Sequence, residues 1–329
     1  MLNRFSKFFA ILLAIVFVVS CSDDDTTTTP TINEGELMIK YIEANGDYVN
    51  TYLPALITAS DLHTLNQTGK AYIIDLRADT DFATGHIKNA VNVKLADLLT
   101  HIKTIDMTKY DKVALVCYTG QTAGFATSLM RFMGYDKVVD LKFGMSSWHN
   151  DFAAKWKGAI GNSYASQFVN TPSPAKPAKG NLPVLTTGKK TGKEILEARV
   201  QALLTEGFGA AGITAQATFQ ELNKYYIANY WTEAQYLDPG HIPGAIQYTP
   251  KESLKYSVDL TTLPTNKPIV IYCHTGTQSS MLAAFLRLLG YDAKSLLYGA
   301  NSMIYDQMVA KNMSIWKDAE IKGLDYEKP

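Results

Sequence analysis

The chain has 329 residues, a length that suits about two domains rather than one. Its 31 basic and 31 acidic side chains give a formal net charge of zero. The sequence also lacks a dense Lys/Arg stripe, so charge argues against a nucleic-acid partner.

The first twenty residues have the features of a signal peptide. Arg4 and Lys7 precede the apolar run FFAILLAIVFVV, which is too short to favour a membrane-spanning helix. The sequence VVSC, ending at Cys21, resembles the lipobox of bacterial lipoproteins, where the cysteine is lipidated after cleavage. The alternative is a buried cysteine in a hydrophobic anchor. We expect lipidation at Cys21 and a protein anchored through that lipid to the outer membrane, facing the periplasm or the cell surface.

The two halves of the remaining chain repeat each other. Cys117 aligns with Cys273, GHIKNAVNV from Gly85 aligns with GHIPGAIQY from Gly240, and LMRFMGYD aligns with FLRLLGYD. A period of about 155 residues indicates a duplicated domain rather than a solenoid. A stretch rich in Pro, Lys, Gly and Thr lies between the halves and indicates a linker. The predicted organisation is a signal peptide at 1–20, a flexible tether at 21–34, domain 1 at 35–158, a linker at 159–192 and domain 2 at 193–329.

Strand and helix patterns alternate within each repeat. In the first repeat we predict strands at 71–76, 90–94, 113–116 and 137–141, and a helix at 122–133 that Gly134 ends. Further helical patches precede the repeats at 34–44 and 192–207. Short apolar runs without strict alternation are typical of a parallel sheet covered on both faces. The ligands of such α/β folds bind at the carboxyl ends of strands, and both cysteines lie there.

A cysteine between a strand and a helix meets inward-pointing amides and the positive end of the helix dipole. Gly120 and Gly276 stand at the fourth loop position, where a positive φ would turn the amides inward. We therefore expect a nucleophilic thiol with a pKa below the free value of about 8.5.

The loop CYTGQT from Cys117 and the loop CHTGTQ from Cys273 resemble the active-site loop of rhodanese sulfurtransferases. The motifs IIDLR with GHIKNA, GHIPGA, FGMSSW and YGANSM resemble other motifs of that family, in order and in both repeats. The resemblance implies two rhodanese-like domains, each a five-stranded parallel sheet sandwiched by helices. It also implies covalent catalysis in which sulfane sulfur moves from thiosulfate or 3-mercaptopyruvate to cyanide or another thiol through a cysteine persulfide.

The same resemblance implies the site residues. Cys117 and Cys273 would be the nucleophiles, and Asp75 with Arg77 would support the first loop. The loop residues would bind the substrate: Tyr118, Thr119, Gly120, Gln121 and Thr122 in the first repeat, and His274, Thr275, Gly276, Thr277 and Gln278 in the second. Asn229 and Trp231 replace the Asp/Arg pair in the second repeat, so which domain turns over stays open. No organic cofactor is implied.

Several alternatives remain beside this interpretation. Each cysteine could be a small core residue, or Cys117 and Cys273 could form a disulfide if their Cα atoms approach within about 6 Å. Neither loop ends in the arginine that a phosphatase of this fold needs. The sequence has neither HExxH nor CxxC, which gives a metal site little support. The competing function is a surface-anchored persulfide carrier or redox-sensing binding module without efficient turnover.

Overall fold

The structure is a computed structural model that describes residues 33–328. Cys21, the predicted signal peptide and nearly all of the predicted tether lie outside the described residues. Within the described range, no helix combines the length and the hydrophobicity needed to cross a bilayer.

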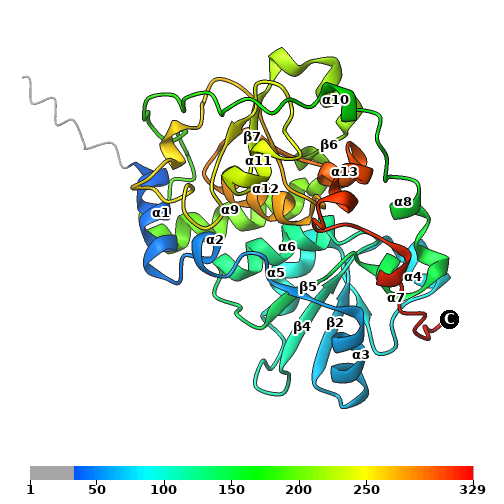
Figure 1. The fold of residues 1–329 in the computed structure, drawn as a ribbon. Coiled ribbons are helices and arrows are strands. Elements are labelled where there is room, and N and C mark those ends of the chain that lie inside the picture. The colour runs from blue at the N-terminus through cyan, green and yellow to red at the C-terminus, as the bar shows by residue number, and fades with distance from the viewer. Residues whose placement is uncertain (1–32, 329) are drawn as a thin grey trace, which may run out of the picture. The chain divides into compact units, whose positions relative to one another are not determined.

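Two parallel sheets of five strands form the framework, one from each half of the chain (Figure 1). The first has the order β1-β5-β4-β2-β3 and the second the equivalent order β6-β10-β9-β7-β8. This confirms the predicted fold class. The strands are β1 (Leu56–Ile57), β2 (Ala71–Asp75), β3 (Val91–Asn92), β4 (Lys112–Val116), β5 (Val138–Leu141), β6 (Gly212–Ile213), β7 (Tyr226–Asn229), β8 (Ile246–Gln247), β9 (Ile269–Tyr272) and β10 (Ala293–Leu296).

Helices cover both sheets and connect their strands. In the first half they are α1 (Glu34–Ala44), α2 (Tyr48–Thr51), α3 (Ala59–Gln67), α4 (Asp79–Thr84), α5 (Leu98–Ile102), α6 (Gln121–Phe132), α7 (Met145–Trp148) and α8 (Ala154–Lys157). In the second half they are α9 (Gly192–Glu206), α10 (Ala215–Gln220), α11 (Glu233–Leu237), α12 (Thr277–Leu288) and α13 (Tyr305–Ala310). The predicted helical patches are α1, α6 and α9, displaced by at most one residue at either end.

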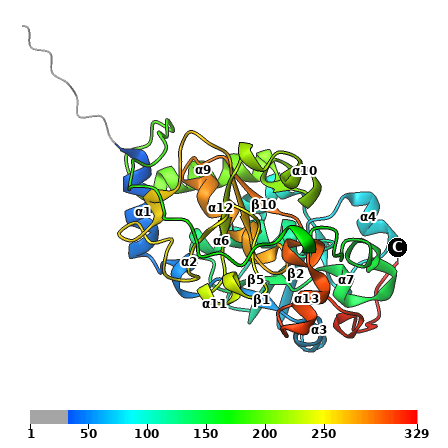
Figure 2. The ribbon, with the colours of Figure 1, turned by 45° about the horizontal axis from the view of Figure 1, so that its top comes forward.

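The helices that follow the two cysteine loops, α6 and α12, pack against each other between the sheets (Figures 1 and 2). The contact is close because Gly124 has no side chain: a Cβ there would lie 2.8 Å from Ser280 Oγ. Further along the helices, Ser128 Oγ donates to the carbonyl of Met281 at 2.9 Å, and the rings of Phe132 and Phe285 stack at 5.6 Å. The duplication therefore places its two equivalent helices face to face.

Each half also contributes an element to the other. Helix α1 packs on α9, and a Cβ on Gly192 would lie 2.4 Å from the carbonyl of Leu37. At the other end of the chain, Glu327 forms an antiparallel bridge with His86, next to the first sheet. Because contacts cross in this way, the domain limits inferred from the sequence stay a prediction.

Candidate active site

The Cys117 loop is formed by backbone groups that turn toward the sulfur. Strand β4 ends at Val116 and helix α6 begins at Gln121. Gly120 has a φ of 81°, as expected, and its amide donates to Cys117 Sγ at 3.2 Å. The amide of Ala123, in the first turn of α6, donates to the same sulfur at 3.4 Å. The loop can thus stabilise negative charge on Sγ, or on a sulfur attached to it, with backbone groups alone.

A closing turn holds the loop from outside. The amide of Met145 donates to the carbonyl of Cys117 at 2.8 Å, and the Trp156 indole N–H donates to that of Thr119 at 3.1 Å. The preceding residue, Gly144, has a φ of 59°, and a Cβ there would lie 2.2 Å from the Cys117 carbonyl. The FGMSSW motif is therefore needed for the shape of the loop.

Cys117 opens into a cavity of about 220 Å³ that carries two basic side chains. Arg77 and Lys155 both line it, and the Lys155 ammonium lies 4.0 Å from the centre of the Tyr118 ring. Among the predicted substrate-binding residues, Tyr118, Thr119, Gln121 and Thr122 line this cavity. Lys155 was missed at the sequence level, because no motif marks it. Asp81 also lines the cavity, so its charged lining is two basic groups and one carboxylate, and its volume suits a compact anion.

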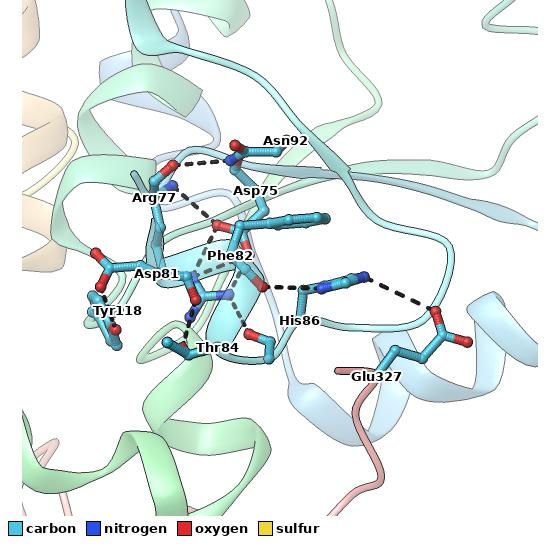
Figure 3. Close-up of polar contacts among 10 residues, drawn as sticks. Asp75, Arg77, Asp81, Phe82, Thr84, His86, Asn92, Tyr118 and Glu327 are labelled. Carbon is cyan, nitrogen blue, oxygen red and sulfur yellow. Dashed lines mark hydrogen bonds and ion pairs between the residues drawn. The ribbon is translucent and has the colours of Figure 1, made fainter. Parts of the chain in front are cut away.

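Asp75 and Arg77 form a buried ion pair beneath the cavity (Figure 3). Arg77 Nη2 lies 2.6 Å from Asp75 Oδ2 and donates to the Gly85 carbonyl at 2.7 Å. Asn92 Nδ2 donates to the carbonyls of Asp75 and Arg77, both at 2.9 Å. Arg77 Nη1 is buried and has no partner within residues 33–328. The pair therefore fixes the guanidinium at the cavity wall and leaves Nη1 without a hydrogen-bond acceptor among the described residues.

Tyr118 and His86 flank this pair in the same view (Figure 3). The Tyr118 hydroxyl donates to Asp81 Oδ1 at 3.0 Å, which ties the cysteine loop to α4. His86 Nδ1 lies 3.1 Å from the Phe82 carbonyl, and its Nε2 lies 4.0 Å from Glu327. His86 is therefore a corner residue bonded to the backbone, which agrees with a structural role.

The expected low pKa of Cys117 is wrong. Burial raises the pKa of the Cys117 thiol to about 11, and the nearby carboxyl of Asp140 adds to the rise. The amides of Ala123, Thr119 and Gly120 lower it, but they do not outweigh these two causes. The sequence reveals the helix dipole at this position but not the loss of water around the sulfur.

Asp140, on β5, is the main feature of this site that sequence analysis missed. Its side chain is fully buried, and neither carboxyl oxygen has a hydrogen-bond partner in the part of the chain that the structure describes. Burial raises the pKa of this carboxyl well above its usual value. At the corresponding position of the second sheet stands Ser295, whose Oγ lies 2.8 Å from Ser279 Oγ. The sequence itself shows this difference, because β5 reads VVDL where β10 reads AKSL, with a carboxyl in one and a hydroxyl in the other.

The Cys273 loop has the same backbone and different neighbours. Gly276 has a φ of 80°, and the amide of Ser279 donates to Cys273 Sγ at 3.3 Å. The Ser279 hydroxyl lies 3.5 Å from the same sulfur, where the first repeat has Ala123. Hydroxyl groups thus replace the buried carboxyl of the first site.

An aromatic stack takes the place of the ion pair in the second repeat. Asn229 Oδ1 accepts from the Trp231 amide at 3.1 Å, just as Asp75 Oδ1 accepts from the Arg77 amide at 3.0 Å. The Trp231 ring stacks on the imidazole of His274 at 5.1 Å, and burial lowers the pKa of His274 to about 4. The second site therefore keeps its cysteine but presents neutral side chains beside it.

The other predicted residues of the second loop lie apart from the Cys117 cavity. Thr275 and Gln278 are half-buried, and Thr277 is buried at the first turn of α12. Gly276 touches the first loop: a Cβ there would lie 2.5 Å from Gln121 Oε1. Cys117 and Cys273 are both free thiols in this structure.

Comparisons with known proteins identify the family of this chain. The family model for the rhodanese-like domain matches residues 58–151 and 227–303, just over half of the chain, and the protein belongs to that family. The thiosulfate sulfurtransferase GlpE of Shewanella oneidensis is 29% identical over 93 residues, which cover 28% of this chain and 90% of the relative. The adenylyltransferase and sulfurtransferase Uba4 of Ogataea parapolymorpha is 29% identical over 77 residues, 23% of this chain.

The chain spans only 20% of that Uba4 protein and 24% of its counterpart in Candida albicans. Among solved structures, a thiosulfate sulfurtransferase from Pseudomonas aeruginosa matches with a TM-score of 0.29 at 16% identity, covering 87% of this chain and 48% of that one. A rhodanese-related protein from Thermoplasma volcanium matches with a TM-score of 0.26 at 26% identity, covering 29% of this chain and 89% of that one.

Proposed function

We propose that the protein is a sulfurtransferase that carries sulfane sulfur as a persulfide on Cys117, with thiosulfate or 3-mercaptopyruvate as donor. The observation that carries the proposal is the cavity at Cys117, where loop amides face the sulfur and Arg77 and Lys155 supply positive charge. A compact anionic donor matches the volume of this cavity and the charge of Lys155.

The transfer with thiosulfate has two steps. The Cys117 thiol loses its proton to solvent, and the thiolate attacks the outer sulfur of the donor. A bond forms between Sγ and that sulfur, the bond to the sulfonate sulfur breaks, and its electron pair leaves with sulfite. Lys155 would hold the anionic sulfonate oxygens, and the loop amides would favour the charged state of the sulfur. The persulfide then passes its outer sulfur to cyanide or another thiol.

Cys273 is proposed to carry sulfur as well, because its loop has the same conformation and directs an amide toward its sulfur. The neutral surroundings of Trp231 and His274 suit an anionic donor less well. We therefore expect Cys117 to be the site that turns over thiosulfate.

A lipid anchor at Cys21, holding the protein to the outer membrane on the periplasmic or exterior side, is a further part of the proposal. Its support is the signal-peptide pattern and VVSC. Replacing Cys21 by alanine should release the protein from the membrane fraction of the cells that produce it.

The test is the intact mass of the protein after brief exposure to thiosulfate or mercaptopyruvate, for the wild type and for Cys117→Ser and Cys273→Ser. We expect each retained cysteine to gain one sulfur atom that cyanide removes. Absence of any gain on reduced protein would overturn the proposal. Labelling without steady-state transfer to cyanide would favour the persulfide-carrier alternative.

A further inference from the structure

A second hollow adjoins the cavity over Cys117. It has a volume of about 490 Å³ and shares three lining residues with that cavity, namely Lys155, Leu297 and Tyr298. The two spaces therefore meet along these side chains. A volume of this size is in the range of sites that bind small organic molecules.

The linings of the two spaces differ in chemistry. The cavity at Cys117 includes the charged side chains of Arg77, Asp81 and Lys155. Apart from Lys155, the lining of the second hollow, all within residues 33–328, consists of neutral residues such as Ala154, Ala159 and Thr214. An apolar body with one negative charge at the Lys155 end would match this arrangement.

The walls of the hollow come from both halves of the chain and are tied together. Helix α8 and the following residues form one wall, and α10 with the residue before it forms the opposite one. The ring of Tyr164, on the chain leaving α8, stacks on Phe219 of α10 at 4.0 Å. The amide of Tyr164 also donates to the carbonyl of Met303 at 3.2 Å. The hollow is therefore a formed feature of the fold.

Tyr298 stands between the hollow and the sulfur. Its backbone amide donates to Gln121 Oε1 at 2.8 Å, and its ring meets Trp156 edge-on at 4.9 Å, so both the backbone and the ring are held. Burial and, to a smaller extent, the charge of Cys117 raise the pKa of Tyr298. A neutral phenol close to the sulfur can donate a hydrogen bond to a persulfide.

We propose that this hollow binds the sulfur acceptor, and that the acceptor is a small thiol with an apolar body and a carboxylate. The inference rests on the proposed function. The acceptor body lies against Ala154 and Ala159, its carboxylate meets Lys155, and its thiol reaches the Cys117 persulfide past Tyr298. The acceptor sulfur, having lost its proton to solvent, attacks the outer sulfur and forms a new S–S bond. The bond to Sγ breaks, and its electron pair stays on Cys117.

The test follows the discharge of a preformed persulfide. The full-length protein carrying Cys273→Ser is loaded with thiosulfate and freed of excess donor. It is then mixed with dihydrolipoate, its uncharged analogue dihydrolipoamide, or cyanide. Ala154→Trp and Gln216→Trp fill the hollow from opposite walls, and Ala178→Trp places the same side chain on the exposed linker. Lys155→Gln removes the charge where the two spaces meet.

We expect Ala154→Trp and Gln216→Trp to slow discharge by dihydrolipoate at least fivefold while cyanide discharges these two variants and the parent at similar rates. Ala178→Trp should have no effect. Lys155→Gln should slow persulfide discharge by dihydrolipoate more than discharge by the uncharged dihydrolipoamide. Equal rates in the filled and control variants would overturn the acceptor site while leaving the proposed function intact. Failure of the parent to form a persulfide would overturn the proposed function, and the acceptor site with it.

Discussion

Replacing Asp140 by asparagine should make the Cys117 thiol more acidic and more reactive. Asp140 is buried without a hydrogen-bond partner among residues 33–328, and its carboxyl is the second cause, after burial, of the raised pKa of Cys117. Asparagine keeps the shape of the side chain and removes the ionisable carboxyl, which is charged only above its own raised pKa. Serine, which stands at the equivalent position 295, should act in the same direction.

The size of the effect follows from the pKa of about 11 for Cys117. At pH 8 such a thiol is roughly one part in a thousand thiolate, whereas a free cysteine is about one quarter ionised. Because Asp140 is the second cause of the shift, we expect its loss to lower the pKa, and each unit lost gives about tenfold more thiolate at a given pH.

The assay is the rate at which iodoacetamide alkylates Cys117 between pH 7 and 10, followed by mass in a Cys273→Ser background. The parent rate should rise about tenfold per pH unit without reaching a plateau, because the thiolate fraction follows pH below the pKa. Asp140→Asn should move this profile to lower pH. Asp136→Asn, which removes an exposed aspartate in the turn just before β5, is the matched control. A profile for Asp140→Asn that coincides with the parent or moves to higher pH would refute the reasoning.

Three further predictions concern the surroundings of the two loops. Arg77→Met should lower the free energy of unfolding in urea by about 3–5 kcal/mol, because it leaves the Asp75 carboxylate buried without its partner. The double variant Asp75→Asn/Arg77→Trp should recover part of that loss. Gly144→Ala should abolish sulfur transfer, since its Cβ would meet the Cys117 carbonyl, whereas Gly134→Ala, also at positive φ but in open space, should retain transfer and lose only about 1–2 kcal/mol. His274 has a pKa of about 4 in the folded protein and about 6.5 in the unfolded chain. Below pH 6.5 the unfolded chain therefore binds a proton that the folded protein does not, and the free energy of unfolding should fall by up to about 3 kcal/mol as pH drops from 6.5 to 4. His274→Gln should flatten that dependence in urea titrations at pH 7.5 and 4.5.

The sequence predicted the fold well because its patterns are local. Helices α1 and α9 could be located from apolar periodicity, and the turns at Gly120 and Gly276 follow from their positions after the cysteines. In the first repeat the edge strand β1 was not located, whereas β3, equally short, lies within the strand predicted at 90–94. Two residues are too few to show a period.

The site was predictable only in part, for a different reason. Loop residues such as Thr119 and Gln121 lie next to the cysteine in sequence and could be named. Lys155 and Tyr298 reach the cavity from α8 and from the other half of the chain, so only the folded arrangement brings them there. The raised pKa of Cys117 depends on burial and on Asp140, and neither can be read from the order of residues around the loop.

The crossing of chain segments between the halves has a consequence for the history of the molecule. Helix α1 packs on α9, and the amides of Lys322 and Leu324 donate to the carbonyls of Ser147 and Trp148. A single-repeat ancestor would have folded without either contact. Once these contacts had formed, each copy depended on the other for part of its own surface. The two copies differ in chemistry, as Asp140 and Ser295 show, yet each relies on the other for part of its surface.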